Sequence, residues 1–231
     1  MEYLSNIELY FCSVVNFEEQ IFLLEQDEFS HAIKVMRNKL GDKIFASDGT
    51  GKIYEGIIED VKKDSLKSKI IKMYEYEDTL KRFTFCIPNL KNPERLKFAL
   101  EKCTELGITK FILFNSTYTA SKGFNLERLN KIVLSAMKQS LRAFLPKIEV
   151  VNSLIELSSF ENELVVFDQM ATSKLSDHKF DEYKNYLMIF GPEGGFSEKE
   201  ISELNKPTSL KLTENRLRAE TAIVKAASII S

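Results

Sequence analysis

From residue 83 to the end, the chain alternates short apolar runs with longer segments of helical periodicity. The apolar runs predict strands at 83–88, 110–114, 163–168, 186–190 and 208–212, and the periodic segments predict helices at 92–107, 126–142, 197–205 and 217–230. Such alternation is typical of a mostly parallel sheet with helices on both faces. This part of the chain therefore predicts an α/β fold, whose ligands bind in the loops beyond the carboxyl ends of the strands.

Residues 1–73 follow a different pattern. β-branched and aromatic runs alternate with turn residues, which predicts several short strands. Apolar residues at helical spacing predict one helix, at 27–37. Short strands with a single helix predict a small, closed or nearly closed β-barrel. The polar segment 74–82 then predicts a boundary before a second domain over 83–231.

Composition narrows the class of protein. The chain has 231 residues, of which 44% are hydrophobic and 29% are charged, as in ordinary globular proteins. No apolar run approaches the roughly 20 residues of a membrane span, and the N-terminus lacks the pattern of a signal peptide. Three distant cysteines and two histidines offer no zinc-ligand spacing. We therefore expect a cytoplasmic protein with reduced thiols, no membrane association and no bound metal.

Charge is distributed unevenly along the chain. Residues 81–150 carry 13 lysines and arginines against 5 acids, although the whole chain has a net charge of -2. At 100° per residue, four cations of the helix predicted at 126–142 fall within an arc of roughly 80°, with no interleaved acid. These are Arg128, Lys131, Lys138 and Arg142. Such a stripe is typical of a phosphate-binding surface, and equally of a solvated helix face.

The segment FGPEGGF, at 190–196, holds three of the nine glycines of the chain. It follows a predicted strand and precedes a helix that begins with a capping box, Ser197 and Glu200. Glycine permits positive φ and a close approach of the backbone to a ligand. Neither a dinucleotide fingerprint nor a P-loop is present. On the pattern alone, a ligand-binding loop and a tight structural turn both remain open.

The segment NRLRAETA, at 215–222, is the second candidate site. Arg216, Arg218 and Glu220 crowd the start of the last predicted helix, and one face of that helix carries mainly small residues. Such a face allows close packing on the sheet or on a second copy of the chain. The charged start of the helix is typical either of a site or of a solvated terminus.

Several segments occur in one order along the chain: HAIKVMRNKLGD at 31–42, EKCTELGI at 101–108, AMKQSLRAFLP at 136–146, GPEGGFS at 191–197 and LRAETA at 217–222. Together they resemble the RsmE-type family of 16S rRNA (uracil-N3)-methyltransferases, in the SPOUT superfamily. The resemblance covers nearly the whole chain. GPEGG together with LRxETA is its most specific element.

The resemblance implies a fold and an activity. The fold would be an N-terminal PUA-like β-barrel that binds RNA, followed by a SPOUT α/β domain with a C-terminal trefoil knot. The knot would bind S-adenosylmethionine, and a homodimer would complete the active site. The activity would be methylation of N3 of one uridine in 16S rRNA, either naked or in the assembled small subunit.

The resemblance and the charge pattern together nominate site residues. Cofactor binding is expected at Phe190, Gly191, Pro192, Glu193, Gly194, Gly195, Leu212, Leu217, Arg218, Glu220, Thr221 and Ala222. Arg218 is expected to stabilise negative charge on a uracil oxygen, and Glu193 or Glu220 to act as base or orienting group. RNA binding is expected at Arg37, Arg95, Lys102, Arg128, Lys131, Lys138 and Arg142.

Three positions depart from the family pattern. Thr213 stands where a glycine is usual, Arg216 where an apolar residue is common, and Tyr118 where the family has an arginine. Apart from these departures, two other functions stay open. One is a SPOUT enzyme that methylates a ribose 2′-hydroxyl, and the other is a ribosome-assembly factor that binds rRNA without catalysis.

Overall fold

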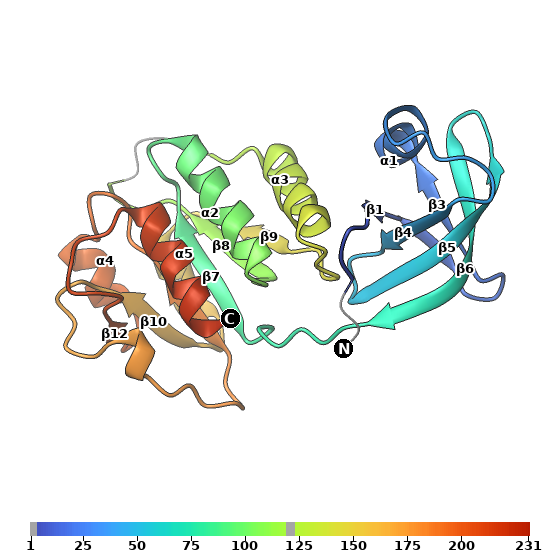
Figure 1. The fold of residues 1–231 in the computed structure, drawn as a ribbon. Helices are drawn as coiled ribbons and strands as arrows, with labels where there is room; N and C mark the ends of the chain where they lie inside the picture. Colours follow the sequence, from blue (N-terminus) through green and yellow to red (C-terminus); the bar gives the residue numbers. More distant parts are fainter. Residues whose placement is uncertain (1–3, 119–122) are drawn as a thin grey trace. The chain divides into compact units, whose positions relative to one another are not determined.

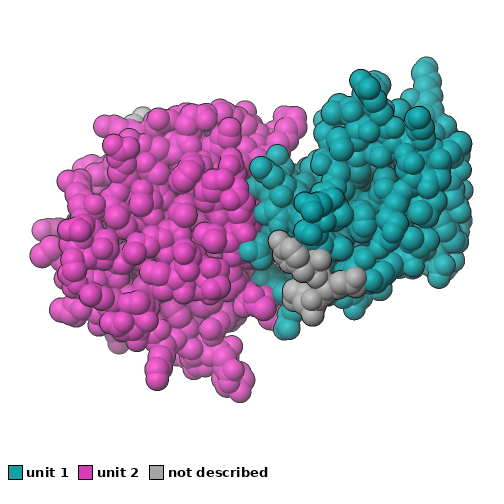
Figure 2. Space-filling model, in the orientation of Figure 1, with its two compact units in different colours: residues 1–78, 134–145 teal, residues 79–133, 146–231 magenta. Residues whose placement is uncertain are grey.

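The computed structural model of the protein describes residues 4–118 and 123–231. The chain forms two compact units, coloured teal and magenta in Figure 2. The first unit contains residues 1–78 and 134–145, and the second contains 79–133 and 146–231. The predicted domain ranges, 1–73 and 83–231, remain a prediction. They placed segment 134–145 in the second domain, whereas the structure groups this segment with the first unit.

The first unit is built on a six-stranded mixed sheet in the order β1-β4-β5-β6-β3-β2. The strands are β1 (Leu9–Phe11), β2 (Val14–Asn16), β3 (Ile21–Glu25), β4 (Lys43–Ser47), β5 (Lys52–Val61) and β6 (Ser65–Glu75). β1 pairs with β4 in parallel, and the other pairs are antiparallel. Register shifts at Glu55/Gly56 and Ile58/Asp60 interrupt the long β5–β6 ladder, and such irregularities bend a sheet towards a barrel.

The helix predicted at 27–37 consists of two parts. α1 (Gln26–Ser30) continues directly into a π-helical turn, η1 (His31–Val35). Phe29 and Ala32 are buried in the core that the sheet encloses, together with Tyr10, Phe22, Leu24, Tyr54 and Leu66. The predicted helix therefore covers the inner face of the barrel-like sheet.

Two glycines explain how segment 134–145 joins the first unit. Gly49 and Gly51 have φ of 74° and 102°, which is conformationally easy only for glycine. Their turn lies against the segment, because Gly51 N donates to Ala143 O at 2.9 Å and Leu145 N donates to Gly49 O at 3.0 Å. A Cβ atom at Gly49 would lie 2.6 Å from Cβ of Leu145. The turn between β4 and β5 thus requires both glycines.

The second unit contains a six-stranded parallel sheet in the order β12-β10-β11-β7-β8-β9, as the prediction of an α/β fold required. Its strands are β7 (Phe83–Pro88), β8 (Lys110–Phe114), β9 (Lys147–Val150), β10 (Glu163–Phe167), β11 (Tyr186–Ile189) and β12 (Thr208–Leu210). The edge strand β9 was not predicted. It is short and mostly exposed, so it lacks the apolar run by which buried strands are recognised.

Helices cover both faces of this sheet. They are α2 (Pro93–Glu105), α3 (Leu126–Gln139), α4 (Glu198–Glu203) and α5 (Ala219–Ile230), with the 3₁₀ turns η2 (Leu154–Ser159) and η3 (Leu175–Asp177). α2 and α5 pack against each other on one face (Figure 1). The other face is covered by η2 and by Leu204, which follows α4.

The predicted signals at the ends of α2 are confirmed. The Asn92 side chain accepts a hydrogen bond from Glu94 N at 2.9 Å, and Pro93 occupies the first helical position. After the helix, Gly107 has a φ of 96°. Cys12, Cys86 and Cys103 are buried and unpaired, and burial raises the pKa of the Cys12 thiol to about 12. Across residues 4–118 and 123–231, no helix is both long and apolar enough to span a membrane.

Candidate functional site

A cavity of about 750 Å³ lies in the second unit, beyond the carboxyl ends of β10, β11 and β12. This is where ligands bind in open parallel sheets. Three loops line most of it: 167–169 after β10, 190–196 after β11 and 212–218 after β12. The start of α5 and Arg95 of α2 complete the wall. Both segments singled out in the sequence, FGPEGGF and NRLRAETA, therefore meet at one cavity.

The loop after β11 is held in shape by its own backbone. Gly195 N donates to Pro192 O at 2.9 Å, and Gly195 has a φ of 74°. Nothing lies within 4 Å of a Cβ atom built on Gly195, so conformation rather than space requires glycine at this position. The tight turn and the cavity wall are thus one feature, although the pattern had left them as alternatives.

The capping box predicted after this loop is present. Ser197 N donates to Glu200 Oε2 at 2.8 Å, and Glu200 N donates to Ser197 Oγ at 3.3 Å. Glu200 Oε1 also accepts hydrogen bonds from Ser116 Oγ at 2.7 Å and Thr117 N at 2.8 Å. Desolvation alone would raise the pKa of Glu200, but these hydrogen bonds together hold it below its ordinary value. Glu200 therefore ties the cavity loop to the end of β8.

The other two glycines of the loop give clearance to aromatic side chains of the protein itself. A Cβ atom at Gly194 would lie 3.1 Å from Cβ of Tyr118, and one at Gly191 would lie 3.3 Å from the Phe196 ring. Tyr118 is the residue that replaces the arginine of the family pattern. In this chain it packs on the candidate cofactor loop.

Most of the predicted cofactor residues line the cavity. They are Phe190, Gly191, Pro192, Glu193, Gly195, Leu212, Leu217, Arg218 and Ala222. Gly194, Glu220 and Thr221 are not among its lining residues, although Glu220 contacts the lining residue Arg95. Sequence reasoning missed Asp168 and Gln169, which follow β10. The rule that sites lie at carboxyl ends of strands could have found them.

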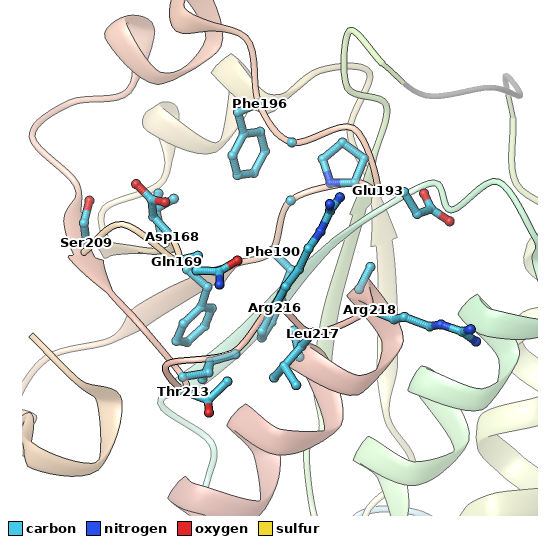
Figure 3. A pocket seen from close by; sticks show the side chains of 18 of the residues that line it. Asp168, Gln169, Phe190, Glu193, Phe196, Ser209, Thr213, Arg216, Leu217 and Arg218 are labelled. Carbon is cyan, nitrogen blue, oxygen red and sulfur yellow. The ribbon is translucent and has the colours of Figure 1, made fainter. Parts of the chain in front are cut away.

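Two neighbouring arginines point to different places. Figure 3 shows the Arg216 side chain extending along the cavity towards the loop that carries Glu193, whereas Arg218 points away from the other labelled side chains. Within residues 4–118 and 123–231, neither forms an ion pair. The sequence analysis named Arg216 in the second candidate site and as a departure from the family pattern, but not among the expected cofactor residues. The structure makes it a lining residue of the cavity.

Arg95 joins the two carboxylates that the sequence proposed for catalysis. Its Nη1 lies 3.3 Å from Glu193 Oε1, and its Nε lies 3.5 Å from Glu220 Oε1. Glu193 Oε2 lies 3.5 Å from Lys91 N. Arg95 was predicted as an RNA contact. In the structure its guanidinium is engaged in the cavity wall.

Acids from neighbouring segments lie beside three of the four cations of the predicted stripe, and its role in RNA binding stays a prediction. Arg128 pairs with Glu94 at 2.7 Å, Lys131 with Glu127 at 2.8 Å, and Lys138 with Glu28. Helical spacing could reveal only Glu127, because Glu94 and Glu28 are distant in the sequence. The stripe is therefore largely neutralised.

The remaining predicted RNA contacts lie in different surroundings. Lys102 pairs with Glu105 at 2.7 Å and Glu101 at 2.9 Å, and these carboxylates raise its pKa. Arg142 lies beyond the end of α3, and desolvation lowers its pKa. Arg37 is exposed after η1, with a φ of 59°. In the described part of the chain, no group of three or more His, Cys, Asp or Glu side chains could hold a metal ion.

Comparison with known families identifies both parts of the chain. Residues 78–231 match the family described as RNA methyltransferase domain, and residues 24–71 match the family described as RNA methyltransferase PUA domain. A curated relative from Borreliella burgdorferi, named ribosomal RNA small subunit methyltransferase E 1, is 31% identical over 90% of this chain and 90% of its own.

Solved structures agree with this assignment. A probable rRNA-methyltransferase from Porphyromonas gingivalis has a TM-score of 0.84 at 27% identity, over 97% of both chains. The ribosomal RNA small subunit methyltransferase E of Neisseria gonorrhoeae has a TM-score of 0.85 at 23% identity, over 96% of both chains, and this likeness shows the fold alone. The predicted fold class, a PUA-like domain before a SPOUT-type α/β domain, is confirmed. The chain therefore belongs to the RNA methyltransferase family whose curated relatives carry the name ribosomal RNA small subunit methyltransferase E.

Proposed function

We propose that this protein transfers a methyl group from S-adenosylmethionine to N3 of one uridine in 16S rRNA. One observation carries the proposal: the GPEGG and LRAETA segments, far apart in the sequence, line one cavity at the carboxyl ends of the strands. The names of the curated relatives support small-subunit rRNA as the substrate. The choice of N3 rests on the resemblance of the two motifs.

The residues of the cavity fit the proposed cofactor. Its wall combines apolar side chains suited to an adenine ring, such as Phe167, Phe190 and Leu217, with the charged groups of Glu193 and Arg216. S-adenosylmethionine likewise combines an apolar ring with a carboxylate, an ammonium and a sulfonium. The Neisseria protein of the same fold was solved bound to S-adenosyl methionine.

Bound S-adenosylmethionine would supply an electrophilic methyl group. A bond from uracil N3 to the methyl carbon would form as the bond from that carbon to sulfur breaks, with its electron pair kept by sulfur. The N3 proton would pass to a base. The protein must orient uracil and stabilise its negative charge. Arg218 suits the stabilisation of charge, because it lines the cavity and its side chain is exposed and points away from the other labelled side chains (Figure 3). Glu193 and Glu220, both in contact with Arg95, are the candidate base and orienting group.

We extend the proposal to partners and location. The PUA-family segment at 24–71 would bind RNA, and a second copy of the chain would complete the site at the helix face of small residues on α5. The trefoil knot around the cofactor is part of the same proposal. A cytoplasmic location follows from an rRNA substrate.

Transfer of labelled methyl groups from S-adenosylmethionine tests this proposal. The purified protein would be incubated with small and large ribosomal subunits from a strain that lacks the modification, and with naked rRNA. We expect label in 16S rRNA only. Label in large-subunit rRNA would contradict the substrate, and absence of label in every sample would contradict the activity.

A further inference from the structure

Arg95 connects three elements of the second unit at the edge of the cavity. Arg95 belongs to the first turn of α2, Glu193 to the loop after β11, and Glu220 to the first turn of α5. Two different nitrogens of the guanidinium contact the two carboxylates, at 3.3 and 3.5 Å. A planar guanidinium presents several donors in fixed directions, so it can hold two acceptors in a fixed relation.

This position would be unfavourable for an isolated cation. The first turn of a helix carries partial positive charge, which disfavours a lysine or arginine there. The carboxylates of Glu193 and Glu220 offset that cost. Side-chain exposure is 32% for Arg95, 25% for Glu193 and 12% for Glu220, so solvent screens these contacts less than contacts at the surface.

The three residues have different relations to the cavity. Arg95 and Glu193 line it, whereas Glu220 does not. Glu220 Oε2 is buried and finds no hydrogen-bond partner among the described residues, whereas Glu220 Oε1 contacts Arg95 Nε. One guanidinium faces two carboxylates, so this group of three residues carries one net negative charge, which the other charged lining residues together offset. The other charged lining residues are Asp168, Arg216 and Arg218.

We propose that Arg95 is a positioning residue for Glu193, and that Glu193 makes the cavity prefer the cationic methyl donor to its neutral product. This inference rests on the proposed function. S-adenosylmethionine and S-adenosylhomocysteine differ by one methyl group and by the positive charge on sulfur. A fixed carboxylate at the wall stabilises the charged ligand more than the neutral one. S-adenosylhomocysteine would then be bound more weakly than S-adenosylmethionine.

Calorimetric titration of the full-length protein with each ligand tests the preference. Glu193→Gln removes the charge and keeps the shape, so we expect the affinity for S-adenosylmethionine relative to S-adenosylhomocysteine to fall about tenfold. Glu94→Gln is the matched control. Glu94 also belongs to the first turn of α2, but it pairs with Arg128 and does not line the cavity. In Glu94→Gln the affinity for S-adenosylmethionine relative to S-adenosylhomocysteine should therefore stay within about twofold of the wild type.

Arg95→Met separates positioning from simple electrostatics. Removing a positive charge from the wall would, by electrostatics alone, strengthen the relative binding of the cationic donor. If Arg95 positions Glu193, the ratio instead falls towards that of Glu193→Gln. The double variant Arg95→Met/Glu193→Gln should then match Glu193→Gln alone, because residues that act as a unit are not additive.

Each outcome decides between these readings. If Glu193→Gln leaves the affinity for S-adenosylmethionine relative to S-adenosylhomocysteine unchanged, Glu193 does not cause the preference for the donor. If Arg95→Met raises this relative affinity, Arg95 does not position Glu193. If the wild type binds neither ligand, the proposed function and this inference both fail. If it binds both and Glu193→Gln keeps the ratio, only this inference fails. Thermal unfolding checks that Arg95→Met is folded. If Arg95→Met does not fold, Glu193→Gln alone still tests the preference for S-adenosylmethionine.

Discussion

Arg216 stands in the cavity at a position where an apolar residue is common in the family pattern. Its side chain has no ion-pair partner within the described residues and extends towards the loop that carries Glu193 (Figure 3). A guanidinium in such a place suits the carboxylate of the cofactor. Arg216→Ala should therefore weaken S-adenosylmethionine binding about tenfold, since a hydrogen bond to a charged group contributes about 1.5 kcal/mol or more.

Methylthioadenosine, which lacks the carboxylate, provides the control for Arg216. Its affinity, measured by the same titration, should change less than about twofold in Arg216→Ala. Equal losses for both ligands would show that Arg216 acts on the adenosine part. Tighter binding of both would show that it obstructs the cavity.

Gly195 is required by conformation, and Gly41 provides a matched comparison. Both have positive φ, 74° and 86°, and neither has an atom within 4 Å of a built Cβ. Each change to Ala should lower the free energy of unfolding by about 1 kcal/mol. Only Gly195→Ala should also weaken S-adenosylmethionine binding, because Gly41 lies in the first unit. If calorimetry shows that Gly195→Ala and Gly41→Ala bind S-adenosylmethionine equally well, the loop of Gly195 is not part of the cofactor site.

At the scale of elements, the capping box of α4 makes the stability of the cavity loop depend on pH. Hydrogen bonds to Glu200 outweigh desolvation and lower its pKa, so the carboxylate stabilises the folded protein above its unfolded pKa, near 4.3. This contribution is lost as the pH falls towards the folded pKa. Glu200→Gln should cost about 1 kcal/mol at pH 7 and progressively less below about pH 4.3.

Denaturant unfolding at several pH values measures this difference. Glu198→Gln is the control, because Glu198 shares the first turn of α4 but is exposed. Its unfolding curve should follow that of the wild type within about 0.5 kcal/mol. A cost for Glu200→Gln that is the same at pH 3 and pH 7 would contradict the role of its charge.

Local signals predicted the elements well, and contacts between distant residues were the part that they could not predict. The caps of α2 and the turn glycines act within a few residues, so the sequence displays them. Segment 134–145 belongs to the first unit, yet the periodicity of α3 continues through Val133 without a break. Likewise, Glu28 and Lys138 are 110 residues apart, so no spacing rule could pair them.

At the scale of the whole molecule, the paired cations bear on RNA binding. Three unpaired contacts to single-stranded RNA would change the slope of log K against log salt by about 2. Because Arg128, Lys131 and Lys138 already contact carboxylates, their joint change to Ala should change the slope by less than that. Filter binding of rRNA at several salt concentrations measures it. An unchanged slope would place the RNA-binding surface elsewhere.

The central claim is that the cavity directs a methyl group to a base nitrogen of 16S rRNA. Mass spectrometry of nucleosides tests it most directly, after the protein and S-adenosylmethionine have acted on small subunits that lack the modification. The account predicts a single new nucleoside with the methyl group on N3 of uracil. A methyl group on the ribose, or no new methylated nucleoside, would contradict it.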